Sequence, residues 1–200
     1  MAAITAKMVN ELRAKTGAGM MECKKALVET EGNFDEAIKV LREKGLGKAD
    51  KKAGRIAAEG VVDIYTEGNT AVMIEVNAET DFVAKNDTFK AFVKGILKVL
   101  VDKKPATVEE LKALPYDADF ETVEAKLKDM IFTIGENMNI RRFQQVVEEN
   151  GFVASYIHAG GKIGVLTEFE TDCCADDADF VTVGKDVCMQ ITAMNPQFLD

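Results

Sequence analysis

Residues that could carry out catalysis are scarce in this sequence. It has no tryptophan and a single histidine, so His158 alone represents the residue type most often used as a general base. A lone histidine near an expected hairpin turn, in "YIHAGGKIG", is more often a surface or packing residue than a base. The four cysteines form no CxxC pair and no cysteine–histidine cluster for zinc. "GGKIG" at 160–164 lacks both the upstream glycine and the Ser or Thr of a phosphate loop. We therefore expect no catalytic residues, no metal and no cofactor, and an enzyme is the weaker interpretation.

Long apolar runs and an excess of positive charge are also missing. No segment approaches the roughly 20 apolar residues that span a bilayer, and "MAAITAKMVNELRAKTG" carries charges every few residues, unlike a signal peptide. The formal net charge of −9 disfavours binding to the phosphate backbone of nucleic acids. We expect a cytoplasmic protein with reduced thiols that binds neither membranes nor nucleic acid directly. A homo-oligomer is compatible with the sequence, but nothing in it argues for one.

The first part of the chain has the pattern of helices only. Thr5 predicts a helix cap, and "TGAG" at 16–19 predicts the break before a second helix, with Met20, Cys23 and Leu27 on one face. Asn33 predicts the cap of a third helix that ends at Gly45. We predict a three-helix bundle over residues 1–46, followed by a basic helical linker over 47–58.

From Glu59 the pattern changes to strands. "VVDIYTEGNTAVMIEVNAE" predicts two strands joined at Glu67-Gly68-Asn69, and a helix with a cap near Asp87 follows. Further helices are expected over Thr107–Leu114 and Asp119–Ile134, and a strand over 138–148. The predicted class is therefore α+β, with antiparallel hairpins and helices.

The strand pattern occurs twice. "EGVVDIYTEGNTAVMIEVNAETDFV" at 59–83 is similar to "NGFVASYIHAGGKIGVLTEFETDCC" at 150–174, with an offset of 91 residues. We predict two related subdomains, 59–148 and 149–200. Phe82, which lies in polar surroundings, corresponds to Cys173 in the second copy, so the fold does not require a large apolar residue there. This favours a functional role for Phe82, although different neighbours in the two subdomains would also explain the change.

Several long motifs resemble one known family. "ELRAKTGAGMMECKKAL" at 11–27, "KKAGRIAAEG" at 51–60, "NAETDFVAKN" at 77–86, "IGENMNIRR" at 134–142 and "HAGGKIGVL" at 158–166 resemble, in the family's order, bacterial elongation factor Ts. The resemblance implies a guanine-nucleotide exchange factor whose partner is elongation factor Tu, in its GDP-bound and nucleotide-free states. It also implies that the N-terminal bundle is ubiquitin-associated-like and docks on this GTPase. Members of this length carry one core subdomain, whereas this chain begins a second, so we expect an incomplete second subdomain and a fragment of a long member.

The resemblance also implies three sets of partner-binding residues. In the family, the Asp-Phe pair of the TDFV block wedges near the nucleotide of the GTPase and disturbs its magnesium site; here the block is Thr80, Asp81, Phe82 and Val83. The docking surface of the bundle corresponds to Arg13, Met20, Met21 and Lys24, although packing of Met21 inside the bundle is an equally good interpretation. Further contacts of the core correspond to Ile134, Gly135 and His158.

Two other functions fit parts of the sequence. A peptide- or ubiquitin-like-binding adaptor would use the N-terminal bundle and treat the core as a scaffold, so residues 1–55 alone would keep the binding. A thiol enzyme would pair Cys173 or Cys174 with His158, and its thiol would be alkylated rapidly at neutral pH.

Overall fold

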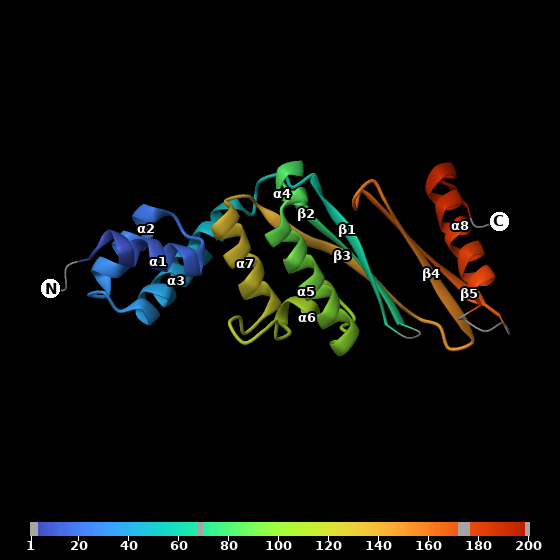
Figure 1. Ribbon diagram of the computed structural model, residues 1–200, viewed down its shortest axis with the longest axis horizontal. Coiled ribbons are helices and arrows are strands. Elements are labelled where there is room, and N and C mark those ends of the chain that lie inside the picture. The colour runs from blue at the N-terminus through green and yellow to red at the C-terminus, as the bar shows by residue number, and fades with distance from the viewer. Residues whose placement is uncertain (1–3, 68–69, 172–176, 199–200) are drawn as a thin grey trace. The chain divides into compact units, whose positions relative to one another are not determined.

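The computed structural model describes residues 4–67, 70–171 and 177–198 (Figure 1). The chain divides into two compact units. Unit 1 contains residues 1–56 and 124–138, and unit 2 contains residues 57–123 and 139–200. The predicted turn at Gly68-Asn69, and Cys173 and Cys174, lie outside the described residues. Within the described part, runs of helices are separated from runs of strands, and the hairpins are antiparallel, as the α+β prediction requires.

Unit 1 is a helical bundle with a fourth helix from later in the chain. It contains α1 (Ala6–Thr16), α2 (Met20–Glu29), α3 (Phe34–Lys52) and nearly all of α7 (Val123–Ile134). Thr5 caps α1 by accepting from Met8 N–H, and Asn33 Oδ1 caps α3 by accepting from Asp35 and Glu36 N–H. The core of the bundle is made of small and aliphatic side chains: Val9, Leu12, Ala18, Cys23, Ala26, Leu27, Ala37 and Leu41.

The predicted end of the third helix at Gly45 is wrong, because α3 continues to Lys52. Gly45 is buried inside the helix, and a Cβ there would lie 3.1 Å from the ring of Phe132 on α7. The glycine therefore provides room for an aromatic ring instead of ending the helix. The buried face of α2 consists of Cys23, Ala26 and Leu27, so Met20 does not share the face on which its spacing placed it with Cys23 and Leu27.

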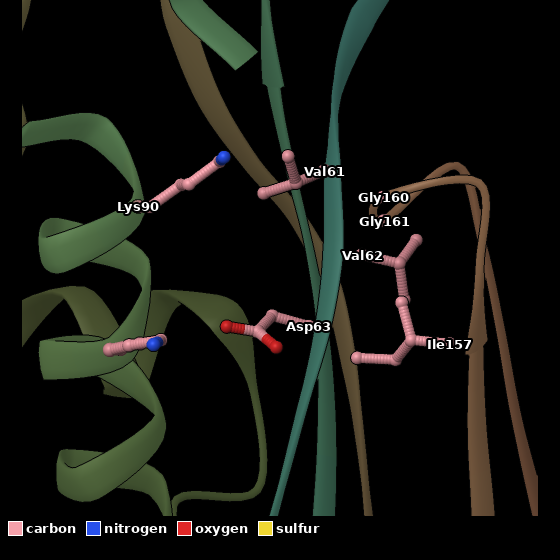
Figure 2. Close-up of a pocket in the computed structure, with 8 residues that line it drawn as sticks. Val61, Val62, Asp63, Lys90, Ile157, Gly160 and Gly161 are labelled. Atoms are coloured by element: carbon pink, nitrogen blue, oxygen red, sulfur yellow. The ribbon is translucent and has the colours of Figure 1, made fainter. Parts of the chain in front are cut away.

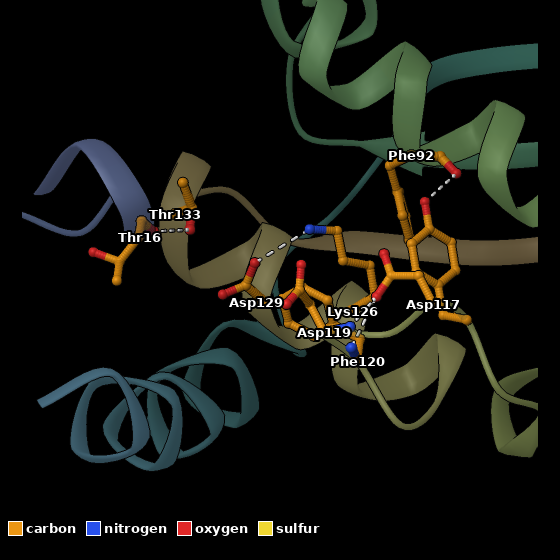
Figure 3. Close-up of polar contacts among 9 residues, drawn as sticks. Thr16, Phe92, Asp117, Asp119, Phe120, Lys126, Asp129 and Thr133 are labelled. Atoms are coloured by element: carbon orange, nitrogen blue, oxygen red, sulfur yellow. Dashed lines mark hydrogen bonds and ion pairs between the residues drawn. The ribbon is translucent and has the colours of Figure 1, made fainter. Parts of the chain in front are cut away.

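The helix predicted from Asp119 begins only at Val123. Asp117 Oδ1 accepts hydrogen bonds from the N–H groups of Asp119 (2.9 Å) and Phe120 (2.8 Å), as Figure 3 shows. Val123 N–H donates to the Leu114 carbonyl at 2.9 Å, and the Phe120 carbonyl accepts from Asp117 N–H at 3.3 Å. Because these backbone groups bond outside the i→i−4 pattern of a helix, residues 117–120 form a turn ahead of α7.

Unit 2 contains the two hairpins. β1 (Glu59–Glu67), β2 (Thr70–Ala78) and β3 (Met138–Val147) form one sheet in that order, and β4 (Gly151–His158) pairs antiparallel with β5 (Ile163–Glu170). The antiparallel pair β1–β2 is followed by the short α4 (Asp81–Lys85), by α5 (Asp87–Lys103) and by α6 (Val108–Ala113). α5 packs on β1 and β2, and α8 (Ala178–Met194) packs on β4 and β5.

The two hairpins differ in the length of their turns. Glu67 pairs with Thr70 in the first, whereas His158 pairs with Ile163 in the second. Gly60 and Gly151 occupy equivalent places, since a Cβ on either would collide with a carbonyl oxygen of the opposite strand. Because the second turn has four residues, Ala159 to Lys162, the offset of 91 residues between Gly60 and Gly151 becomes 93 between their paired residues, Asn77 and Glu170.

Candidate functional site

Phe82 lies on the exposed side of a helix whose other side is buried. α4 starts after Thr80, which has extended backbone angles (φ −127°, ψ 157°). Val83 and Ala84 are buried, and α4 packs on β1, β2 and α5. Successive helical residues are rotated by about 100°, so a helix that buries positions 83 and 84 turns position 82 outward. The Phe82 side chain is 80% exposed. It is therefore held out by a short helix that packs on β1, β2 and α5, and it takes no part in the core.

Asp81, beside Phe82, is held by a charge one turn along α4. Lys85 Nζ donates to Asp81 Oδ2 at 2.7 Å. This hydrogen bond and the lysine charge hold the pKa of Asp81 below its ordinary value, and Lys162 lowers the pKa further. Asp81 in turn raises the pKa of Lys85. At neutral pH the exposed end of α4 thus presents an aromatic ring next to an ionised carboxylate.

The junction of α4 and α5 fixes this geometry. Asn86 ends α4 and caps α5: its N–H donates to the Val83 carbonyl (2.9 Å), and its Oδ1 accepts from Thr88 N–H (2.8 Å) and Phe89 N–H (3.3 Å). Phe89, on the first turn of α5, is fully buried. One asparagine therefore connects the exposed end of α4 to the core of unit 2.

The residues predicted on the bundle are exposed as well. Arg13 lies in the last turn of α1, and Met20, Met21 and Lys24 lie on α2, where positions three and four apart share a face. Met20 is 52% exposed and Met21 is 63% exposed. This exposure rules out the alternative in which Met21 packs inside the bundle.

Ile134 and Gly135 lie at the end of α7, which contacts the turn that precedes Met20 through Thr133. Ile134 is the last residue of α7 and Gly135 follows it, whereas Thr133 Oγ1 donates to the Thr16 carbonyl at 3.4 Å (Figure 3). Gly17, which has a positive φ of 67°, leaves room for the Thr133 methyl group, since a Cβ there would lie 2.4 Å from it. The end of α7 and the turn between α1 and α2 are thus neighbours in unit 1, although they are more than a hundred positions apart in the sequence. Thr133, which the sequence analysis did not single out, makes both of these contacts.

His158 is exposed at the end of β4, and its Nδ1 lies 3.1 Å from Tyr156 Oη. The turn that follows it contains Lys162, whose charge acts on Asp81, so His158 and the TDFV residues belong to the same end of unit 2. The charged residues Glu59, Lys85 and Lys162 were missed at the sequence level. The i, i+4 spacing of Asp81 and Lys85 was the only available signal.

Metal-binding clusters and membrane-spanning helices are both absent from the residues that the structure describes. Over residues 4–67, 70–171 and 177–198, no group of three His, Cys, Asp or Glu side chains could hold a metal ion. None of the helices in those ranges is long and apolar enough to cross a membrane. Cys23 and Cys188 are free thiols, and both are buried.

By its fold, the chain is an α+β protein whose distinctive surface features are exposed apolar side chains on short, well-anchored helices. A family model described as "Elongation factor TS" matches residues 79–200. The chain is 54% identical over 197 residues to elongation factor Ts of Syntrophotalea carbinolica, covering 98% of this chain and 65% of that protein. It is 54% identical over 205 residues to elongation factor Ts of Clostridioides difficile strain 630, covering all of this chain and 65% of that protein. The chain belongs to the elongation factor Ts family, and it spans about 65% of the length of these relatives.

Proposed function

We propose that this chain is a translation elongation factor that binds elongation factor Tu and promotes the release of GDP from it. The observation that carries the proposal is the exposed Phe82 beside the ionised Asp81 on α4, a helix whose remaining residues are fixed by burial and hydrogen bonds. The proposed site residues are Thr80, Asp81, Phe82 and Val83 on the wedge, Arg13, Met20, Met21 and Lys24 on the bundle, and Ile134, Gly135 and His158. The division into a docking bundle (1–46), a linker (47–58) and two subdomains (59–148 and 149–200) is part of the same proposal.

The mechanism needs differential binding and no bond chemistry of its own. An exchange factor that binds the nucleotide-free GTPase more tightly than the loaded one weakens nucleotide binding by the same factor. A thousandfold faster release requires about 4 kcal/mol of barrier lowering. Burial of one phenylalanine supplies about 1.5–3 kcal/mol, and a few well-placed side chains dominate most interfaces. Phe82 would contribute apolar burial, and Asp81 would compete for donors around the magnesium ion of the partner.

The test is the release of labelled GDP from purified elongation factor Tu, with and without the chain, at several chain concentrations. The proposal predicts release that accelerates with concentration and saturates. Release at the spontaneous rate, with the chain shown to be folded by circular dichroism, would contradict it.

An adaptor that uses the bundle alone is the second candidate, and the exposed Met20 and Met21 favour it. The two functions predict different results when Phe82 is replaced. An adaptor would keep its partner when Phe82 is replaced, whereas an exchange factor would keep part of its affinity and lose its effect on GDP release.

A further inference from the structure

The two copies of the hairpin are joined by a backbone hydrogen bond at the edge of β1. Val62 N–H donates to the Gly161 carbonyl at 2.7 Å. Ala159, Gly160 and Gly161 have positive φ values of 50°, 67° and 97°, which bend the second turn toward β1. A Cβ on Gly161 would lie 3.0 Å from the Val62 carbonyl oxygen, so the close approach requires glycine. Figure 2 shows Gly160 and Gly161 beside Val62, with the side chains of Val62 and Ile157 pointing toward each other.

The contact continues through the residue after Gly161. Lys162 forms an ion pair with Glu59, the first residue of β1. Glu59 pairs in register with Ala78 at the end of β2, three residues before α4 begins. The turn of the second hairpin is therefore attached, by a backbone bond and by an ion pair, to the part of the first sheet from which α4 starts.

Charges of opposite sign are paired around the start of α4 and the first residue of β1. Lys85, on α4, pairs with Asp81, and Lys162, from the turn, pairs with Glu59. The two pairs also act on each other: Lys162 lowers the pKa of Asp81, and Glu59 raises the pKa of Lys85. The charged groups acting on Asp81 thus come from its own helix and from the second hairpin.

We propose that Lys162 is a positioning residue: through Glu59 and through its attraction for the Asp81 carboxylate, the turn of the second hairpin holds α4, and with it Phe82, in a fixed orientation. The two additional residues of this turn allow it to reach the first copy. The consequence for nucleotide exchange rests on the proposed function, whereas the positioning itself can be measured on the chain alone.

Three variants of the full chain distinguish a positioning role of Lys162 from effects of its side-chain size and of the net charge of the protein. Lys162→Gln keeps most of the side-chain length and removes the charge, whereas Lys162→Arg keeps the charge. Lys98→Gln removes a different exposed charge, on α5; Lys98 forms no ion pair in the described part of the chain. Without any partner, Lys162→Gln should raise the pKa of Asp81, measured by carboxyl NMR, because a nearby positive charge is lost. It should also speed hydrogen exchange of the Ala84 and Asn86 amides, which bond to Thr80 and Val83 of this segment, by at least about threefold.

In the exchange assay, the saturating rate of GDP release should fall about threefold or more for Lys162→Gln, because a misplaced wedge loses orientation and not only affinity. Lys162→Arg should restore the Asp81 pKa, the amide protection and the rate, and Lys98→Gln should change none of them.

Each outcome decides a different question. An unchanged Asp81 pKa and unchanged amide exchange in Lys162→Gln would overturn the positioning role, whatever the exchange assay shows. Altered α4 measurements with unaltered GDP release would overturn the link to exchange. If the unmodified chain does not accelerate GDP release but Lys162→Gln still changes α4, the proposed function fails and the positioning role stands.

Discussion

Phe82 is the residue on which the proposed function depends most directly. Phe82→Ala should change the free energy of unfolding by less than about 0.5 kcal/mol, because an exposed ring gives up little packing. It should slow the accelerated release of GDP at least about tenfold, which corresponds to about 1.4 kcal/mol. Stability would be measured by urea denaturation, and release by stopped-flow fluorescence.

The matched control is Phe198→Ala, because Phe198 is 83% exposed and is of the same type but lies far along the chain from α4. It should leave both measurements unchanged. A loss of about 3–5 kcal/mol in Phe82→Ala, with GDP release per folded molecule unaltered, would instead assign Phe82 to the core.

Met20 and Met21 permit a test of docking that is separate from the wedge. Replacing both with alanine should weaken the complex with elongation factor Tu by about 1–3 kcal/mol, since both are exposed and flexible apolar side chains at the start of α2. Isothermal titration calorimetry measures the change, and circular dichroism should show an unaltered bundle. Val28→Ala is the control on the same helix, where Val28 is 58% exposed. Equal affinity of the double variant and the original chain would remove this surface from the proposal.

At the scale of single elements, α7 contains a carboxylate that the fold does not favour in its ionised form. Burial raises the pKa of Asp129 above its ordinary value of 3.8. The positive charges of Lys126, whose Nζ lies 3.6 Å from Asp129 Oδ2, and of Arg42 lower this pKa but offset only part of the rise. Because the folded pKa is higher than the unfolded one, the folded state binds the proton more tightly. The stability associated with this group is greatest at low pH and is lost as the pH rises through the folded pKa.

Asp129→Asn should therefore stabilise the chain at pH 7 by about 0.5 kcal/mol, a value reduced for partial exposure of the group. The advantage should shrink as the pH approaches 3.8, where the carboxyl of the original chain also becomes protonated. Thermal denaturation at several pH values would test this. A lower melting temperature of the variant at pH 7 would mean that the ion pair with Lys126 outweighs the cost of burial.

Most element positions could be predicted from local patterns. The caps Thr5 and Asn33 and the hairpin signal act within a few residues, and their elements begin where expected. The errors share a cause, which is a partner distant in sequence or a competing turn. Gly45 does not end its helix because Phe132 packs on it, and the helix expected from Asp119 starts late because the backbone groups of Asp117, Phe120 and Val123 bond within a turn.

The candidate site was predictable in part for the same reason. Phe82 stood out because its neighbours are polar and because its counterpart in the second copy is not large and apolar. The Asp81–Lys85 pair has a visible helical spacing. The pairing of Glu59 with Lys162, 103 positions later, depends on how the second turn reaches β1 and has no local signal.

At the scale of the whole molecule, the two repeated subdomains differ in how well their helices are buried. α5 and α8 both have 17 residues, but seven of α5 are buried against two of α8. α8 also leaves apolar side chains exposed: Val181, Val183, Met189 and Met194. Helices with few buried contacts open at lower free energy.

We therefore expect the amides of α8, β4 and β5 to exchange hydrogen faster than those of α5, β1 and β2. Mass-spectrometric hydrogen exchange on the full chain would measure both sets in one experiment, and the equal length of α5 and α8 makes them an internal comparison. Equal protection of the two helices would show that the second subdomain is as stable as the first.

The discontinuity of unit 1 has a consequence for how the protein is made. Its first three helices end at Lys52, but the ring that packs on Gly45 belongs to Phe132, and unit 1 is complete only at residue 138. Chains are synthesised at about 5–20 residues per second, so the nascent bundle waits roughly 4–16 s for its last helix to be translated. During this interval the apolar surface that Phe132 covers is open to chaperones on the growing chain. A mutation that weakens the bundle should consequently reduce the yield of folded protein more during synthesis than during refolding of the finished chain.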